Sequence, residues 1–203
     1  MNLIPRFYDV TGGRVLVDGV DVREQEQDML HRKIGIVPQK AFLFSGTVAD
    51  NLRYGKEDAT QEEMLHTLEI AQARSFVEKL PNGLYDMVSQ SGTNLSGGQK
   101  QRLSIARALA KKADLYIFDD SFSALDFKTD AALRKALADE VKDAAVLIIA
   151  QRISTIMNAE QIIVLEEGRI VGIGNHDFLL QTCPVYQDIA KSQMKGDANH
   201  ERE

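Results

Sequence analysis

Residues 95–99, Leu-Ser-Gly-Gly-Gln, are the stretch of this sequence that decides the fold. A helical pattern follows over about 96–112, with Ser96 at the N-cap position and Gln99 placed to complete a capping box. Gly97 and Gly98 leave the first turn without Cβ atoms, so a bulky anion can approach the free backbone N–H groups there. Those groups and the helix dipole favour a phosphate. Taken alone, the stretch could also be an ordinary helix cap, which is the less favoured alternative.

An apolar run that ends in two acids follows the helix. Residues 115–120, Leu-Tyr-Ile-Phe-Asp-Asp, predict a buried strand that presents carboxylates at its end. In α/β proteins ligands bind at that edge of a parallel sheet. Ser123-Ala124-Leu125-Asp126, a helix and a second apolar strand over 145–150 come next.

This series of motifs, at this spacing, resembles the nucleotide-binding domain of ATP-binding cassette (ABC) transporters over nearly the whole chain. The resemblance implies an α/β fold: a P-loop NTPase (RecA-like) core with an inserted helical subdomain. The expected parts are a partial core with a hairpin and the Q-loop over 1–40, the helical subdomain with the ABC signature over 41–112, the core with the Walker B motif, D-loop and switch region over 113–194, and a disordered tail over 195–203.

Composition narrows the function classes. The chain has 203 residues, enough for a real core, and its 24 basic and 30 acidic residues give a net charge of −6. No basic run is present, so nucleic acid is not an expected partner. Cys183 is the only cysteine, which excludes a disulfide framework and fits a reducing compartment.

The sequence predicts no membrane segment of its own. No apolar run approaches the roughly 20 residues of a spanning helix. Arg6 and Asp9 interrupt the N-terminus early, unlike a signal peptide. A membrane role therefore requires a partner, and the resemblance implies a place on the cytoplasmic face of the cell membrane, held by a transmembrane partner or domain.

The first residues match the middle of the family's domain. Residues 1–9 predict the last turns of a helix, which in the family directly follows the phosphate-binding loop G-x-x-x-x-G-K-[ST], or Walker A motif. The sequence contains no such loop. We therefore expect a core that lacks its N-terminal strands, leaves strand 145–150 with an open edge, and is poorly stable as a monomer or oligomerises.

The remaining pattern predicts local elements. They are a hairpin over 13–22, a short helix over 25–32, a strand over 33–37, a helix over 61–80, a hairpin over 162–171 and a closing helix at 174–180. Gln39 follows the strand that Pro38 ends, and it resembles the Q-loop glutamine that reaches Mg²⁺ and the attacking water.

Residues 42–55 resemble the exporter branch, in which this segment receives the coupling helices of the membrane domain. Phe42, Leu43 and Phe44 are the residues expected to contact those helices, because three exposed apolar side chains in one loop would be a liability without a partner. The alternative is that they belong to the core.

The resemblance also implies the ligands, ATP and Mg²⁺, and the roles of individual residues. Asp119 would hold Mg²⁺ through water, and Asp126 would lie in the D-loop that crosses a dimer interface or cap the helix after it. The signature residues would bind ATP held by a second nucleotide-binding domain; they are Ser96, Gly97, Gly98 and Gln99.

Two positions depart from a hydrolysing site. The family has a glutamate where this chain has Asp120, and a switch histidine where it has Gln151. The aspartate carboxylate stops about 1.5 Å short, and a displacement of about 1 Å can cost roughly a hundredfold in rate. Glutamine cannot take up a proton near pH 7 as histidine can. Together these changes resemble the degenerate half of a heterodimeric exporter.

Three hypotheses follow. The first is the ATP-binding domain of an ABC exporter with a degenerate site, paired with a non-identical partner. The second is a non-transport ABC-type ATPase, which the short helical insertion and residues 42–55 disfavour. The third is a non-enzymatic fragment that cannot bind ATP alone, which the missing loop favours.

Overall fold

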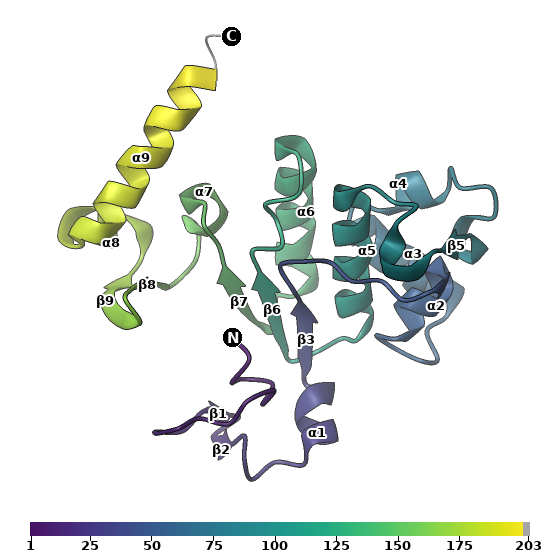
Figure 1. Ribbon diagram of the computed structural model, residues 1–203, viewed down its shortest axis with the longest axis horizontal. Helices are drawn as coiled ribbons and strands as arrows, with labels where there is room; N and C mark the ends of the chain where they lie inside the picture. The colour runs from purple at the N-terminus through teal and green to yellow at the C-terminus, as the bar shows by residue number, and fades with distance from the viewer. Residues whose placement is uncertain (201–203) are drawn as a thin grey trace. The chain divides into compact units, whose positions relative to one another are not determined.

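A three-stranded parallel sheet forms the centre of the first of two units. The computed structural model describes the backbone of residues 1–200 and the side chains of residues 1–193. The first unit spans residues 1–149 and the second begins at Ala150, and each is described by itself. The sheet has the order β3-β6-β7, from β3 (Ile34–Val37), β6 (Leu115–Asp119) and β7 (Ala145–Ile149). Its parallel pairing confirms the predicted α/β fold (Figure 1).

Side chains alternate across this sheet, as the period of a strand requires. Tyr116 and Phe118 of β6 join the larger core on one face, while Ile117 joins a smaller cluster on the other. That smaller cluster includes Leu30 of α1 (Gln27–Arg32), the short helix that the sequence predicted. Both faces of β6 are therefore buried, and only its carboxyl end reaches the rim.

The helical part of the first unit packs around α5 (Gly97–Ala110). Both α2 (Val48–Arg53) and α3 (Gln61–Ile70) lie against α5, and α5 also contacts β3. Figure 1 shows these helices grouped on the β3 side of the sheet. The remaining short elements here are β4 (Gly46–Thr47), α4 (Arg74–Val77), the 3₁₀ turns Gly83–Tyr85 and Gln90–Gly92, and β5 (Met87–Val88).

The helical period predicted over 61–80 is shared by two helices. The structure divides it into α3 and α4, with Gln72 between them at φ +56°. Arg102 of α5 donates from Nη1 to the carbonyl oxygen of Gln72 at 2.6 Å, which satisfies the backbone at the break. Met64, Leu68 and Val77 are buried, so the apolar period correctly reported burial but not helix continuity.

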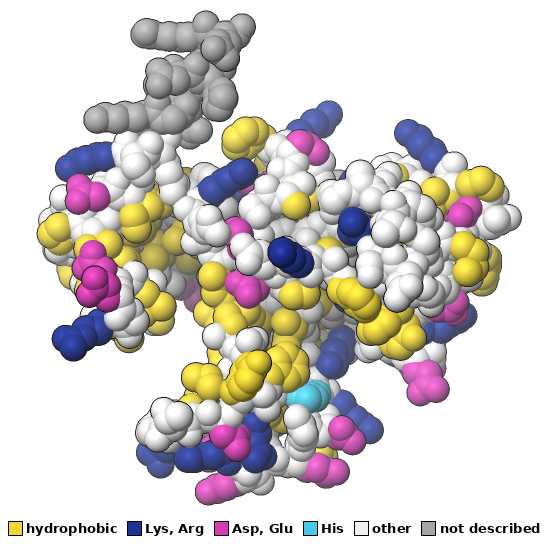
Figure 2. All heavy atoms as spheres, in the orientation of Figure 1, with side chains coloured by type: hydrophobic (Ala, Val, Ile, Leu, Met, Phe, Trp, Pro, Cys, Tyr) yellow, Lys and Arg dark blue, Asp and Glu magenta, His cyan; other side chains and the backbone are white. Residues whose placement is uncertain are grey.

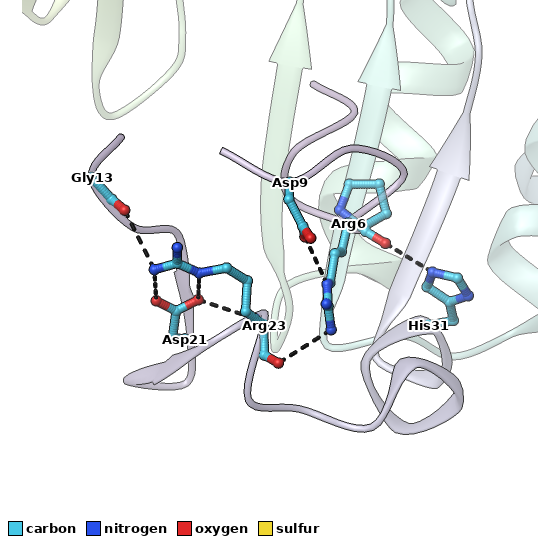
Figure 3. Close-up of polar contacts among 7 residues, drawn as sticks. Arg6, Asp9, Gly13, Asp21, Arg23 and His31 are labelled. Atoms are coloured by element: carbon cyan, nitrogen blue, oxygen red, sulfur yellow. Dashed lines mark hydrogen bonds and ion pairs between the residues drawn. The ribbon is translucent and has the colours of Figure 1, made fainter. Parts of the chain in front are cut away.

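A polar network ties the first residues to the hairpin that follows them (Figure 3). The hairpin is β1 (Leu16–Val17) and β2 (Val20–Asp21), and it confirms the prediction. Arg6 donates to Asp9 at 2.8 Å and to the carbonyl oxygen of Arg23 at 3.2 Å, while Arg23 forms a bidentate pair with Asp21. His31 of α1 contacts the carbonyl oxygen of Pro5 at 2.8 Å. Residues 2–6 form turns, and not the helix end that the sequence predicted.

Strand β7 lies at the edge of the sheet. Among the described residues it pairs with β6 and with no other strand. Ala145 and Val146 are exposed and the rest of the strand is half-buried. The helix before it, α6 (Phe127–Glu140), contacts α3. The open edge predicted for this strand is therefore present.

The second unit is built on an antiparallel hairpin and two helices. The hairpin is β8 (Ile162–Glu166) and β9 (Arg169–Gly174), as predicted, and α8 (His176–Thr182) and α9 (Pro184–His200) follow it after the short α7 (Ile153–Ile156). Ile162 and Val164 of β8 pack with Leu179 of α8, Tyr186 of α9 and Cys183 between the two helices. Figure 1 shows α9 as the longest element of this unit.

The remaining features of the fold are the helix lengths and the C-terminal segment. Within the described part of the chain, no helix has the length and apolar character that a membrane crossing needs. The disordered tail predicted over 195–203 overlaps the end of α9, and its last three residues lie outside the described residues. That tail and the predicted division at residues 40 and 112 stay predictions.

Candidate functional site

The N-terminus of α5 has the capped geometry that the sequence predicts. Ser96 is the N-cap, with φ −66° and ψ 161°, and its hydroxyl oxygen accepts from the backbone N–H of Gln99 at 3.3 Å. In return the Gln99 side-chain oxygen accepts from the Ser96 N–H at 2.9 Å. The capping box is therefore complete, and it fixes the direction in which the first turn faces.

The two glycines of the signature have different surroundings. A Cβ added at Gly97 would meet nothing within 4 Å, so the approach to the first-turn N–H groups is open. A Cβ at Gly98 would stand 3.4 Å from the carbonyl oxygen of Ala124 and 3.9 Å from Leu125. The signature therefore lies directly against the Ser-Ala-Leu-Asp segment, which follows β6.

Gln39 and the acids after β6 meet at the carboxyl edge of the sheet. Gln39 follows β3, and its side-chain nitrogen donates to Oδ2 of Asp120 at 3.2 Å, although 81 positions separate them. Asp119 is the last residue of β6 and is half-buried. Two adjacent parallel strands thus bring the three predicted residues to one rim.

Asp120 is held by its backbone. Its φ is +44°, in the left-handed region that aspartate tolerates better than most residues. The Asp120 N–H donates to the carbonyl oxygen of Ile149 at 2.8 Å, and its own carbonyl oxygen accepts from the Ser123 hydroxyl at 2.8 Å. These bonds fix where the side chain starts.

Ser121 is a residue of this region that sequence reasoning missed. It is fully buried, and its hydroxyl donates to the carbonyl oxygen of Val37 at 2.9 Å. This bond joins the end of β3, just before Gln39, to the loop after β6. The sequence offered one signal for this role, which is a serine directly after the Asp119-Asp120 pair.

Asp126 caps the helix after the site. Its side chain accepts from the backbone N–H of Thr129 at 2.9 Å and from the Thr129 hydroxyl at 2.7 Å. These two bonds, the backbone one first, lower the pKa of the Asp126 carboxyl below its usual range. The N-cap interpretation is confirmed, and the role at a dimer interface stays a prediction.

Gln151 belongs to the second unit. It precedes α7 and is exposed, and its carbonyl oxygen accepts from the side chain of Gln193 at 2.6 Å. The side-chain oxygen of Gln193 accepts from the Ile153 N–H at 2.8 Å. The start of α7 is therefore tied to α9 within the same unit.

The donors at the rim fit a divalent cation that binds together with phosphates. The carboxylate of Asp119 and the amide oxygen of Gln39 are hard oxygen ligands of the kind Mg²⁺ prefers. Among the described residues, no group of three or more His, Cys, Asp or Glu side chains is arranged to hold a metal ion. Mg²⁺ commonly uses one or two carboxylates and takes its other ligands from substrate and water.

The loop at 42–44, predicted to contact the coupling helices, has two exposed side chains and one buried side chain. Phe42 and Phe44 are 46% and 40% exposed, while Leu43 is 0% exposed and belongs to the core. The prediction that Leu43 contacts a coupling helix is therefore wrong, because Asn51 fixes the loop backbone by bonding both the N–H and the carbonyl oxygen of Phe44, each at 2.9 Å. Successive side chains then point to opposite sides.

Tyr54 is the third exposed aromatic residue next to Phe42 and Phe44. Its ring lies 4.3 Å from that of Phe44, which lies 5.1 Å from Phe42. Arg107 donates to the carbonyl oxygen of Phe42 at 2.8 Å and lies over the ring of Phe44. We call Phe42, Phe44 and Tyr54 the aromatic surface; Figure 2 shows hydrophobic side chains gathered around α2 at the lower right.

A separate hollow lies on the helical part of the first unit. An open groove of about 730 Å³ is lined mainly by α3, with Glu63 and His66, and by Glu140 of α6. It contains none of the predicted site residues. The rim of the sheet, and not this groove, remains the candidate site.

Comparisons with known proteins agree with this geometry. The family model described as ABC transporter matches residues 1–123. An uncharacterized ABC transporter ATP-binding protein of Mycobacterium tuberculosis is 50% identical over 196 residues, which cover 95% of this chain and 33% of that protein. An ATP-dependent lipid A-core flippase of Syntrophus aciditrophicus is 43% identical over 197 residues, which cover 97% of this chain and 33% of that protein.

A solved structure gives the same result. The bacterial Atm1-family ABC exporter with ATP bound superposes with a TM-score of 0.92 at 36% identity, covering 95% of this chain and 34% of that one. The chain therefore spans about a third of the length of the relatives that it matches.

Proposed function

The chain belongs to the ABC transporter family, and we propose that it forms the ATP-binding domain of an exporter. ATP binding and hydrolysis would drive movement of a substrate across the membrane. The observation that carries the proposal is the meeting of Gln39 with Asp120 at the rim of the sheet, beside the capped start of α5. Relatives named as a lipid flippase and a multidrug export protein support the exporter branch.

The residues at the rim have separate tasks in this proposal. Asp119 and Gln39 hold Mg²⁺ with the nucleotide phosphates, and the ion neutralises phosphate charge. The signature, Ser96 to Gln99, presents its open N–H groups to ATP held by a second nucleotide-binding domain. Asp126 lies where the D-loop of the family crosses between the two domains.

We propose that Asp120 and Gln151 each slow ATP hydrolysis and leave ATP binding intact. The Asp120 carboxylate is short for polarising an attacking water, and Gln151 can donate a hydrogen bond but cannot accept a proton as histidine can. The partner domain is therefore expected to be non-identical and to supply the residues of the competent site. The intact signature of this chain would complete that site.

The aromatic surface is the proposed contact with the membrane domain. Phe42, Phe44 and Tyr54 are exposed together and are braced by Arg107, whereas Leu43 stabilises the loop from inside. Through this contact the domain would sit on the cytoplasmic face of the cell membrane. Nucleic acid is not a proposed partner.

A second candidate is that residues 1–203 alone are a module that binds no nucleotide. The absence of a phosphate-binding loop from the sequence and the open edge of β7 favour it for the isolated chain. It predicts no ATP affinity without that loop. The exporter proposal predicts affinity once the loop is present.

Equilibrium binding of Mg-ATP tests the two candidates. We would compare the 203-residue chain with a longer form that also carries a phosphate-binding loop. Binding at micromolar to millimolar level by the longer form alone supports the exporter proposal. Tight binding by the short chain would place the phosphates somewhere other than proposed.

Hydrolysis then tests the degenerate site. In the assembled transporter at saturating Mg²⁺, Asp120→Glu combined with Gln151→His should raise ATP turnover by at least tenfold, since each change restores a group that the family uses. Asp143→Glu, an exposed change of the same chemistry, is the matched control. Unchanged turnover in the double variant would contradict the degenerate-site proposal.

A further inference from the structure

The contact between Gln39 and Asp120 determines how the glutamine amide is oriented. An ionised carboxylate only accepts hydrogen bonds, so the end of the amide that faces it must be the nitrogen. That nitrogen lies 3.2 Å from Oδ2 of Asp120. Because the amide is planar, its oxygen then lies on the side away from Asp120.

We propose that Asp120 is a positioning residue, whose carboxylate holds the Gln39 amide so that its oxygen is presented to a divalent cation bound with nucleotide. The inference rests on the proposed function, since it needs an Mg-nucleotide at this rim. On this view Asp120 has a positioning function that does not depend on its being a shorter substitute for glutamate.

The backbone around Asp120 supports this role. Bonds to Ile149 on one side and Ser123 on the other, each 2.8 Å long, hold it in the left-handed region. With the backbone fixed, the single methylene of aspartate places the carboxylate within reach of Gln39. A glutamate there would move the carboxylate by about 1.5 Å, which a bond already 3.2 Å long cannot absorb without a change of rotamer.

The backbone just before Gln39 is also fixed. Ser121 donates to the carbonyl oxygen of Val37 at 2.9 Å and fixes the chain two residues before Gln39. Gln39 itself is exposed, so little packing restrains its side chain. The bond from Asp120 is therefore the described contact that orders the exposed end of this side chain.

Two readings of Asp120 give opposite predictions. If the residue positions Gln39, what matters is an acceptor at this distance, and an asparagine oxygen serves as well as a carboxylate. If it acts through its charge on water or metal, asparagine is harmful and glutamate is beneficial. Loss of a partner that orients a metal ligand typically costs 10- to 100-fold in metal affinity.

The test is a Mg²⁺ titration of the assembled transporter with a non-hydrolysable ATP analogue, alongside binding of the analogue in EDTA. A transporter with two nucleotide sites should give two Mg²⁺-binding transitions, and the one that Asp119→Asn removes belongs to this chain. We expect Asp120→Glu and Asp120→Ala each to raise the Mg²⁺ concentration for half-maximal binding about tenfold, with affinity in EDTA unchanged. Asp120→Asn should stay within about twofold of the wild type, because its amide oxygen accepts the same bond.

Each outcome has one meaning. An unshifted titration with Asp120→Glu, or an Asp120→Asn as impaired as Asp120→Ala, overturns the positioning role. Absence of analogue binding in both Mg²⁺ and EDTA overturns the proposed function, and this inference with it. Asp120→Asn is nearly isosteric, so its result stands even where the longer or shorter side chain disturbs folding. Asp143→Glu is the control for an added methylene.

Discussion

Adjacent residues of one loop should fail in different ways when truncated. Leu43 is 0% exposed, and one of its methyl groups packs beneath Gly92, where an added Cβ would stand 3.2 Å away. Leu43→Ala should therefore leave a cavity and cost about 3 kcal/mol of unfolding free energy. Phe42 is 46% exposed, so Phe42→Ala should cost only about 1 kcal/mol.

Two assays separate these effects in the assembled transporter. In thermal unfolding, the expected losses are about 9 °C for Leu43→Ala and about 3 °C for Phe42→Ala. In ATP hydrolysis, Phe42→Ala should retain basal turnover and lose most of the increase that transported substrate causes, since the change removes part of the proposed contact with the membrane domain. Equal thermal losses in the two variants would refute the assignment of Leu43 to the core. Full substrate stimulation in Phe42→Ala would refute the docking surface.

Further predictions concern caps, glycines and acid. Ser96→Ala should cost about 1 kcal/mol of stability by removing the α5 cap, while Ser96→Thr costs less, as denaturant unfolding would show. Gly55→Ala should prevent accumulation of folded protein, because its Cβ would lie 2.1 Å from the Arg107 carbonyl oxygen; Gly97→Ala should fold normally and weaken nucleotide binding. Hydrogen bonding from Lys56 lowers the pKa of the Glu63 carboxyl to about 2, below its ordinary 4.5. The stability that the wild type gains over Glu63→Gln should therefore be constant above about pH 5 and fall as the pH drops toward 2. Urea unfolding at a series of pH values measures this difference.

The parts of the site that depend on local chemistry could be predicted from the sequence. A serine followed three residues later by glutamine specifies a capping box wherever a helix begins, and the box at Ser96 is present. An apolar run ending in acids specifies a strand that delivers them to a rim, and Asp119 ends β6 as predicted. Such features depend on a few neighbouring residues.

Features set by distant contacts could not be predicted in the same way. The break at Gln72 keeps the apolar period intact, and its carbonyl oxygen is satisfied by Arg102 from another helix. Leu43 is directed inward because Asn51, in the next helix, bonds the backbone of Phe44. A pattern of apolar residues shows that burial occurs, but it does not show which of several adjacent side chains is buried.

Asp120 combines both cases. The motif alone identifies the residue as a departure and predicts a loss, because a shorter acid reaches less far toward a water. The structure adds a left-handed backbone and a glutamine 81 positions away, and these make the short side chain the one that fits. If the Mg²⁺ titration follows the positioning role, the substitution favours retention of nucleotide at this site over its turnover. Retained nucleotide would hold the two proposed nucleotide-binding domains together, so slow hydrolysis and firm positioning would be two consequences of the same residue.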